Sequence, residues 1–450
     1  MNKDYILGID IGHGQVKVSY LNEEKNSAEI YDFSFGQGNA TIPSVAQEIN
    51  GELILGDLAI TMPGPIIKDI SSDEEILATF INETLEVIND REPNARIKHI
   101  TFAVPENSKP EKLIAAIEKL EIPKNLIAFK TVNDCILNFH FNKKNEAFKN
   151  LLVINYGAEA LRINFWSRKE KGIYTKEGSY FDKELGMNVL EKNLTDALQG
   201  IYEEHTSKTL SMEDIYNIRA FTHENKNNIL KTPKATKLYF NFSEPFEHRF
   251  SPIELVSPFT NEFEAFLKNF ISWQNIDASD VEEVLLIGGG FNMPWPSDIV
   301  EVLFPDSNIT LHKKPEFAIS LGAALSTKSR NTVRLEKPIL PFDIGIMVKS
   351  GEKEAFYPII VSGEINGYQV YTAKTIVNLT KPFTLKIYKD DKISRPSILK
   401  AIEIPNLHKP EYAGALEIQM SISNNTLNVA VVDKSFENPE GIVAEDSVLL

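Results

Sequence analysis

The chain has few of the features that mark secreted, membrane-spanning and nucleic-acid-binding proteins. Its 450 residues include one cysteine, Cys135, which excludes an internal disulfide. No apolar run approaches the length needed to cross a bilayer, and the first residues lack the charged leader and apolar core of a signal peptide. Basic residues number 47 against 63 acidic ones, and the net charge of −16 disfavours nucleic acid and anionic lipid. We therefore expect a cytoplasmic protein that binds neither nucleic acid nor a membrane.

Three glycine-bearing turns, far apart in the sequence, each follow an apolar run that reads as a strand. They occur in YILGIDIGHGQVKVSY, LLVINYGAEALRINFW and EEVLLIGGGFNMPWP. One such turn is weak evidence for function. Three suggest a single nucleotide site assembled from distant segments, because glycine lets backbone N–H groups approach phosphate oxygens closely. The sequence therefore predicts ATP binding.

The residues of the first turn suit a phosphate and a metal ion. Asp10 is a carboxylate inside an apolar run, which is costly unless a cation such as a magnesium–phosphate complex compensates it. Gly12, His13 and Gly14 are placed to approach phosphate, and Lys17 would add a positive charge. The motif is neither a dinucleotide fingerprint nor a P-loop. Taken alone, it fits a plain hairpin turn with a solvated histidine and lysine equally well.

Strands and helices alternate through the first two thirds of the chain, which predicts a covered α/β sheet. A strand-rich start is followed by a helical stretch, EEILATFINETLEVIN, and by a strand at 99–105. A second strand-rich unit begins at Leu151 and echoes that order, as in an internal duplication. The segment 185–250 reads as polar and helical. The next helix carries a stripe that helical spacing assigns to the core, namely Phe259, Phe263, Phe266 and Phe270.

The last quarter of the chain has the period of strands. Apolar and polar residues alternate over 383–388 and 416–423, and Asn424 and Asn425 predict a hairpin turn before the next strand. We therefore expect an all-β sandwich at 341–450, which a charged linker at 331–340 joins to a domain at 1–330.

Motifs along nearly the whole chain resemble, in order, those of the seventy-kilodalton heat-shock chaperone family of the DnaK type. They are GIDIGHGQVK, TIPSVAQEINGELILGDLA, HITFAVPENSKPEKLIAAIEKL, TVNDCILNF, EEVLLIGGGFNMP and PEFAISLGAAL. The resemblance implies a duplicated actin-like (ribonuclease-H-like) ATPase domain, with lobes of about 1–150 and 151–330, before a β-sandwich similar to a peptide-binding domain. It further implies ATP or ADP with Mg²⁺ as cofactors. Extended or unfolded peptide and a protein cochaperone are the implied partners.

The same resemblance gives roles to single residues. Asp10 would face the magnesium-bound water, and Lys68 and Asp134 would stand in for the family's catalytic lysine and glutamate. Asn155 and Ala160 replace an acidic residue and a threonine of the second phosphate loop, so hydrolysis is expected to be slow or absent. The nucleotide-binding residues would be Gly12, His13, Gly14, Lys17, Gly157, Ala158, Glu224, Asn228, Gly288, Gly289, Gly290, Asn292 and Glu316.

Departures from the family pattern define the remaining alternatives. Glu159 stands where the family has glycine and would bring a side chain near phosphate. The family's helical lid is missing after the sandwich, so bound peptide should dissociate quickly. We expect a chaperone-like protein that binds ATP, with pseudo-ATPase behaviour as one form. The alternative is an actin-like structural or regulatory protein that assembles or binds partners in a nucleotide-dependent way. A small-molecule kinase is a third and weaker interpretation.

Overall fold

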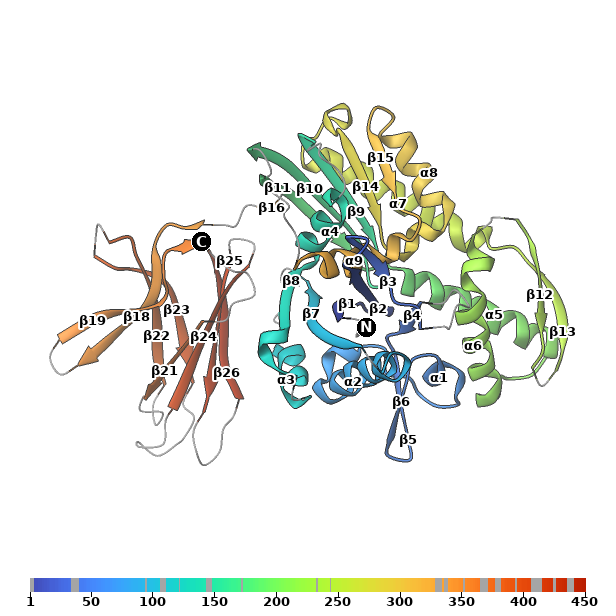
Figure 1. The fold of residues 1–450 in the computed structure, drawn as a ribbon, viewed down its shortest axis with the longest axis horizontal. Helices are drawn as coiled ribbons and strands as arrows, with labels where there is room; N and C mark the ends of the chain where they lie inside the picture. The colour runs from blue at the N-terminus through green and yellow to red at the C-terminus, as the bar shows by residue number, and fades with distance from the viewer. Residues whose placement is uncertain are drawn as a thin grey trace. The chain divides into compact units, whose positions relative to one another are not determined.

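The computed structural model consists of two compact units (Figure 1). The larger comprises Met1–Val104 and Glu111–Glu336, and most of the smaller is Lys337–Leu450. Each unit is described by itself. The described residues are 4–33, 40–93, 95–105, 111–120, 122–142, 148–170, 173–231, 234–242, 244–327, 334–335, 339–350, 353–364, 371–376, 382–392, 395–405, 415–423, 426–434 and 441–450.

The first half of the larger unit is built on a sheet with strand order β3-β2-β1-β7-β8, in which β4 also pairs with β2. β1, β2 and β3 are antiparallel neighbours, whereas β7 and β8 run parallel to β1. Its strands are β1 (Asp4–Ile11), β2 (Gln15–Asn22), β3 (Ser27–Ile30), β4 (Thr41–Pro43), β7 (Arg96–Val104) and β8 (Ile127–Thr131), with a separate hairpin of β5 (Ala46–Ile49) and β6 (Glu52–Leu55). Its helices are α1 (Gly56–Thr61), α2 (Glu74–Arg91), α3 (Glu111–Lys119) and α4 (Val132–Phe141).

The second half repeats this strand order. Its sheet runs β15-β14-β9-β10-β11-β16, so β11-β10-β9-β14-β15 matches β3-β2-β1-β7-β8 in both order and strand direction. The strands are β9 (Asn150–Tyr156), β10 (Leu161–Glu170), β11 (Ile173–Asp182), β14 (Glu283–Ile287), β15 (Asn308–Leu311) and β16 (Arg334–Leu335). The helices are α5 (Met187–Thr206), α6 (Met212–Leu230), α7 (Ile253–Trp273), α8 (Pro294–Leu303) and α9 (Ala318–Leu325).

Two helices in equivalent positions, α4 and α9, pack against one another where the halves meet (Figure 1). They approach so closely at Gly322 that a Cβ there would lie 1.8 Å from the backbone oxygen of Cys135. α9 also lies against β1, because a Cβ on Gly8 would be 2.2 Å from the backbone nitrogen of Ala324. The Ser19 and Ser320 hydroxyls share a buried hydrogen bond of 2.8 Å at the same interface. The two halves of the larger unit therefore pack against each other through α4, α9 and β1.

The structure differs from the prediction in one segment of the second half. The expected polar and helical stretch at 185–250 contains α5 and α6, but it ends in a hairpin of β12 (Thr236–Phe240) and β13 (Phe246–Phe250). Aromatic contacts explain the hairpin, since Phe240 and Phe246 stack at 4.7 Å and both pack on Tyr202 of α5. The stripe predicted for α7 is confirmed, because all four phenylalanines are buried.

The smaller unit contains two four-stranded antiparallel sheets whose apolar faces share one core. One sheet is ordered β19-β18-β22-β23 and the other β21-β24-β25-β26. Their strands are β18 (Asp343–Ser350), β19 (Lys353–Ile360), β21 (Tyr371–Ile376), β22 (Phe383–Asp390), β23 (Ser397–Ile404), β24 (Ala415–Ser423), β25 (Thr426–Asp433) and β26 (Gly441–Leu449), beside a short pair of β17 (Ile339–Leu340) and β20 (Gly363–Glu364). The predicted pairing of β24 with β25 is present, and the turn residues Asn424 and Asn425 lie outside the described residues.

Among the described helices, none is long and apolar enough to cross a membrane.

Candidate functional site

The two halves carry the same turn at the same place. The turn at residues 12–15 follows β1 and ends on the first residue of β2, and residues 157–160 join β9 to β10. Each turn is closed by its leading glycine: Gly12 N–H donates to Gln15 O at 3.2 Å, and Gly157 N–H donates to Ala160 O at 3.0 Å. The strand pairings place Asp10 opposite Lys17 and Asn155 opposite Arg162. The two halves therefore contribute equivalent turns that differ in their flanking charges.

The charges beside the first turn are paired with each other. Asp10 is only 7% exposed, and the Lys17 ammonium donates to its Oδ2 at 3.2 Å. Lys17 also donates to the Gln15 carbonyl at 3.1 Å. Ser44 supports the turn from outside, because its hydroxyl donates to Gly12 O at 2.5 Å and its N–H donates to Gly14 O at 3.1 Å. Asp10 and Lys17, two of the predicted site residues, thus lie together beside the glycine turn and are paired with each other.

A carboxylate within the second turn gathers three basic side chains. Glu159 Oε2 lies 2.9 Å from Arg162 Nη2 and 3.4 Å from the ring Nδ1 of His13, and Oε1 lies 3.2 Å from Lys183 Nζ. Partial burial raises the pKa of Glu159, but the combined effect of His13, Lys183 and Arg162 lowers it below its ordinary value. Glu159 is therefore a stabilised anion within the second turn.

The first two turns face one another. A Cβ on Gly14 would lie 2.6 Å from the Cβ of Ala158, and the contact between His13 and Glu159 bridges the same gap. The start of α5 supports the second turn, since Met187 N–H donates to Gly157 O at 3.1 Å and Asn188 N–H donates to Ala158 O at 2.9 Å. The predicted phosphate loops of the two halves are therefore neighbours.

The third glycine turn packs on the end of β9, directly before the second turn. Gly288 has φ +95°, and a Cβ there would lie 2.4 Å from Tyr156 O and 2.8 Å from Asn155 Oδ1, so glycine is required on two counts. Gly290 similarly leaves room for the Tyr156 ring, and Gly289 lies near Glu316. The Asn292 amide donates to Glu316 Oε2 at 3.3 Å. These predicted site residues are brought together beside β9.

Lys68 lies beside the first turn, and Asp134 lies at the start of α4. Asp134 lies in the first turn of α4, where its N–H donates to Thr131 Oγ1 at 2.6 Å. Burial raises the pKa of the neighbouring Cys135 thiol, and the charges of Asp134 and Asp10 raise it further. The exposed Lys68 lines a small pocket together with Ile11, Gly12, His13, Asp69, Ile70 and Ser71.

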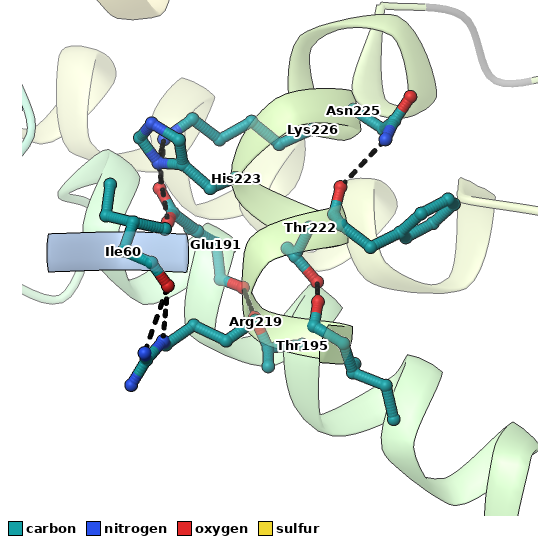
Figure 2. Close-up of polar contacts among 10 residues, drawn as sticks. Ile60, Glu191, Thr195, Arg219, Thr222, His223, Asn225 and Lys226 are labelled. Carbon is teal, nitrogen blue, oxygen red and sulfur yellow. Dashed lines mark hydrogen bonds and ion pairs between the residues drawn. The ribbon is translucent and has the colours of Figure 1, made fainter. Parts of the chain in front are cut away.

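Helix α6 carries two predicted nucleotide-binding residues, and a contact with α5 that the sequence analysis did not predict. Glu224 and Asn228 are exposed, and neither side chain forms a hydrogen bond or ion pair with another residue in the described part of the chain. His223 and Lys226 contact Glu191 of α5, with His223 Nδ1 3.8 Å from Glu191 Oε1 and Lys226 bound to Oε2 (Figure 2). Helical spacing could have found this pair, because positions 223 and 226 share a face.

Arg219 of α6 links the two halves at a second place that the sequence did not reveal. Its guanidinium donates to Ile60 O at 3.0 and 3.3 Å (Figure 2). It also donates to Met62 O at 2.9 Å and to Gly64 O at 2.9 Å. These carbonyls lie at and just beyond the end of α1, where helical carbonyls lack intrahelical partners. A side chain of the second half thus caps a helix of the first.

Sequence comparison relates the chain to chaperones, although no family model matches it. It is 22% identical to "Chaperone protein DnaK" of Metamycoplasma hominis, over 99% of this chain and 80% of that protein. The corresponding protein of Mycoplasmopsis synoviae (strain 53) is 24% identical over 72% of this chain and 58% of its own length. That of Mycoplasmopsis pulmonis (strain UAB CTIP) is 24% identical over 83% and 67%. These weak, long similarities support a heat-shock-type relationship and suggest a chaperone-like function.

Proposed function

We propose that the larger unit binds an adenine nucleotide between the three glycine turns, and that the chain is a heat-shock-type chaperone-like protein with slow or no ATP hydrolysis. The observation that carries the proposal is the meeting of the turns at 12–15 and 157–160, with Gly288–Gly290 beside the second. Turns of this kind present backbone N–H groups to phosphate. The repeated strand order supports an actin-like duplication, and the similarity to DnaK proteins supports adenine as the base.

The described residues fit a magnesium ion that the nucleotide carries, rather than one that the protein binds alone. They contain no group of three His, Cys, Asp or Glu side chains that could hold a metal. Mg²⁺ in such sites takes one or two carboxylates and otherwise phosphate oxygens and water. Asp10 and Asp134 can supply those carboxylates. When bound, the ion would neutralise phosphate charge, and this chain's residues would position the nucleotide.

Slow turnover is proposed from the chemistry of the second turn. Asn155 is an amide where Asp10 is a carboxylate, so this position cannot accept a proton from attacking water. Arg162 and Glu159 bind each other there. Positioning of water and stabilisation of developing charge, which phosphoryl transfer needs, therefore rest on Asp10 and Asp134.

The smaller unit is proposed to bind extended peptide. Each of its sheets ends in strands with one unpaired edge among the described residues, β19 and β23 in one sheet and β21 and β26 in the other. Such edges accept an additional strand through backbone hydrogen bonds. A peptide that binds this way would depend on backbone pairing more than on its sequence.

The first experiment incubates the protein in excess over labelled ATP and Mg²⁺, then separates bound from free label and measures the fraction converted to ADP. We expect retained label that is mostly intact ATP. Asn155→Asp should raise ADP formation by about tenfold or more, because it restores a carboxylate at the second turn. Asn261→Asp, the same change at an exposed position of α7, should have no effect. Absence of retained label would overturn the proposal, and fast conversion by the unaltered protein would overturn slow turnover.

A further inference from the structure

The strongest unexplained feature of the site is the carboxylate of Glu159, which lies where the two turns face each other. It contacts His13 of the first turn at 3.4 Å, and Arg162 and Lys183 of the second half at 2.9 and 3.2 Å. Three basic groups around one acceptor form the arrangement that proteins use to bind phosphate. In this structure the acceptor belongs to the chain itself.

We propose that Glu159 is a resident anion, which occupies the position of a nucleotide phosphate and must leave before the phosphates can bind. This inference rests on the proposed nucleotide site. The phosphate chain then takes over the contacts with His13, Arg162 and Lys183. Glu159 thereby lowers the affinity for phosphate-bearing ligands and keeps the facing turns together when no nucleotide is present.

The surroundings of Glu159 favour displacement over a fixed structural role. Its side chain is 26% exposed, and its partners His13, Arg162 and Lys183 are 41%, 41% and 64% exposed, so each can turn toward solvent or a ligand. By contrast, the side chains of Asp10 and Lys17 are only 10% and 13% exposed. The backbone of Glu159 is restrained, because a Cβ on Gly186 would lie 2.3 Å from its carbonyl oxygen. Displacement therefore requires rotation of the side chain, with the turn left in place.

The competition predicted here is specific for phosphate. Adenosine has no phosphate and does not need the place of the carboxylate, whereas ATP and inorganic tripolyphosphate do. Removal of the charge at position 159 should therefore strengthen binding of the two phosphate-bearing ligands and leave adenosine binding unchanged. A general opening or closing of the site would change the affinity for all three ligands.

The test compares the full chain with Glu159→Gln by titration calorimetry with ATP, tripolyphosphate and adenosine. We expect Glu159→Gln to bind ATP and tripolyphosphate about tenfold more tightly, equal to about 1.4 kcal/mol at 25 °C, with the same Kd for adenosine. The matched control is Glu184→Gln, which removes the same charge from an exposed side chain nearby and should change none of the three affinities. Glu159→Asp keeps the charge on a shorter side chain and should fall between the unaltered protein and Glu159→Gln. It serves as a second variant if Glu159→Gln does not fold.

The outcomes separate this inference from the proposed function. Equal ATP affinity for the unaltered protein and Glu159→Gln would overturn the resident anion and leave nucleotide binding intact. A matching gain for adenosine would also overturn it, because the effect would then not be competition with phosphate. Failure of every variant to bind ATP would overturn the proposed function itself. Binding of ATP by Glu159→Gln alone would support both.

Discussion

The turns at residues 12–15 and 157–160 are closed by the same backbone hydrogen bond but differ in the charged side chains beside them. In the first, Asp10 and Lys17 face each other across β1 and β2 and are nearly buried. In the second, Asn155 is neutral, and Arg162, which stands in the place of Lys17, binds Glu159 within the turn. In the second half, therefore, the carboxylate of the pair lies in the turn, where a ligand would approach, and its basic partner lies on the strand.

This difference distinguishes the residues that the hairpin requires from the charged residues that can adapt to a ligand. Both turns keep the leading glycine and the hydrogen bond that closes the turn, since the hairpin depends on them. The flanking charges vary because they do not determine the backbone. A buried charge strongly destabilises the fold when its partner is removed, whereas half-exposed charges can exchange one partner for another at small cost. We therefore assign the fixed charge of the site to the first turn and its adjustable charge to the second.

The largest expected effect comes from breaking the packing that both halves share. Gly322→Ala would place a methyl group 1.8 Å from Cys135 O, so α4 and α9 must separate. We expect a loss of about 3 kcal/mol or more in the free energy of unfolding, measured by urea denaturation. Gly200→Ala in α5 is the matched control, because its Cβ meets nothing within 4 Å, and it should be neutral or slightly stabilising. Equal stability of the two variants would contradict the close crossing.

The next effect comes from making the first turn resemble the second. Asp10→Asn leaves the Lys17 ammonium nearly buried without a counter-charge, and we expect a loss of about 2–3 kcal/mol in the free energy of unfolding. The double variant Asp10→Asn with Lys17→Met removes both charges and should recover most of that loss. A double variant as unstable as the single one would mean that the pair does not account for the effect.

Much of the framework follows from patterns in the sequence, whereas the contacts of the site do not. The apolar runs before Gly12, Gly157 and Gly288 predicted the strands β1, β9 and β14, and the spacing of Phe259, Phe263, Phe266 and Phe270 predicted the buried face of α7. The sequence also flagged Glu159 as a side chain near phosphate. Its partner His13 is 146 residues away, and a contact over such a separation has no local signal.

Helix α6 also contains a contact that the sequence analysis did not predict. The resemblance singled out Glu224 and Asn228 as nucleotide-binding residues, and both are exposed. It did not reveal that His223 and Lys226 contact α5. The contact between α6 and α5 is a separate feature, which the resemblance did not address. The roles of Glu224 and Asn228 in nucleotide binding stay predictions.

Helices α5 and α6 form an insertion that the second half has and the first half lacks. Arg219→Met removes the donors that α1 receives from α6, so the end of α1 loses partners for three carbonyls. We expect a loss of about 1–2 kcal/mol in the free energy of unfolding and faster amide hydrogen exchange within 56–64. Arg249→Met, at an exposed position of β13, should leave that exchange unchanged. Unchanged exchange in Arg219→Met would show that α1 does not depend on this cap.

The smallest expected effect is a pH dependence within the same insertion. Burial raises the pKa of Glu191, but His223 and Lys226 outweigh it and bring the pKa from 4.5 to about 2. The folded state therefore favours the charged carboxylate, so its contribution is present above about pH 4.5 and is lost as the pH falls toward 2. At pH 6, Glu191→Gln should cost about 1 kcal/mol in the free energy of unfolding, and urea denaturation should show this difference unchanged down to about pH 4.5 and shrinking from there toward pH 3. Glu204→Gln, an exposed position of the same helix, should show no such trend. A Glu191→Gln penalty that stayed constant over this range would mean that the ionised carboxylate is not what couples α5 to α6.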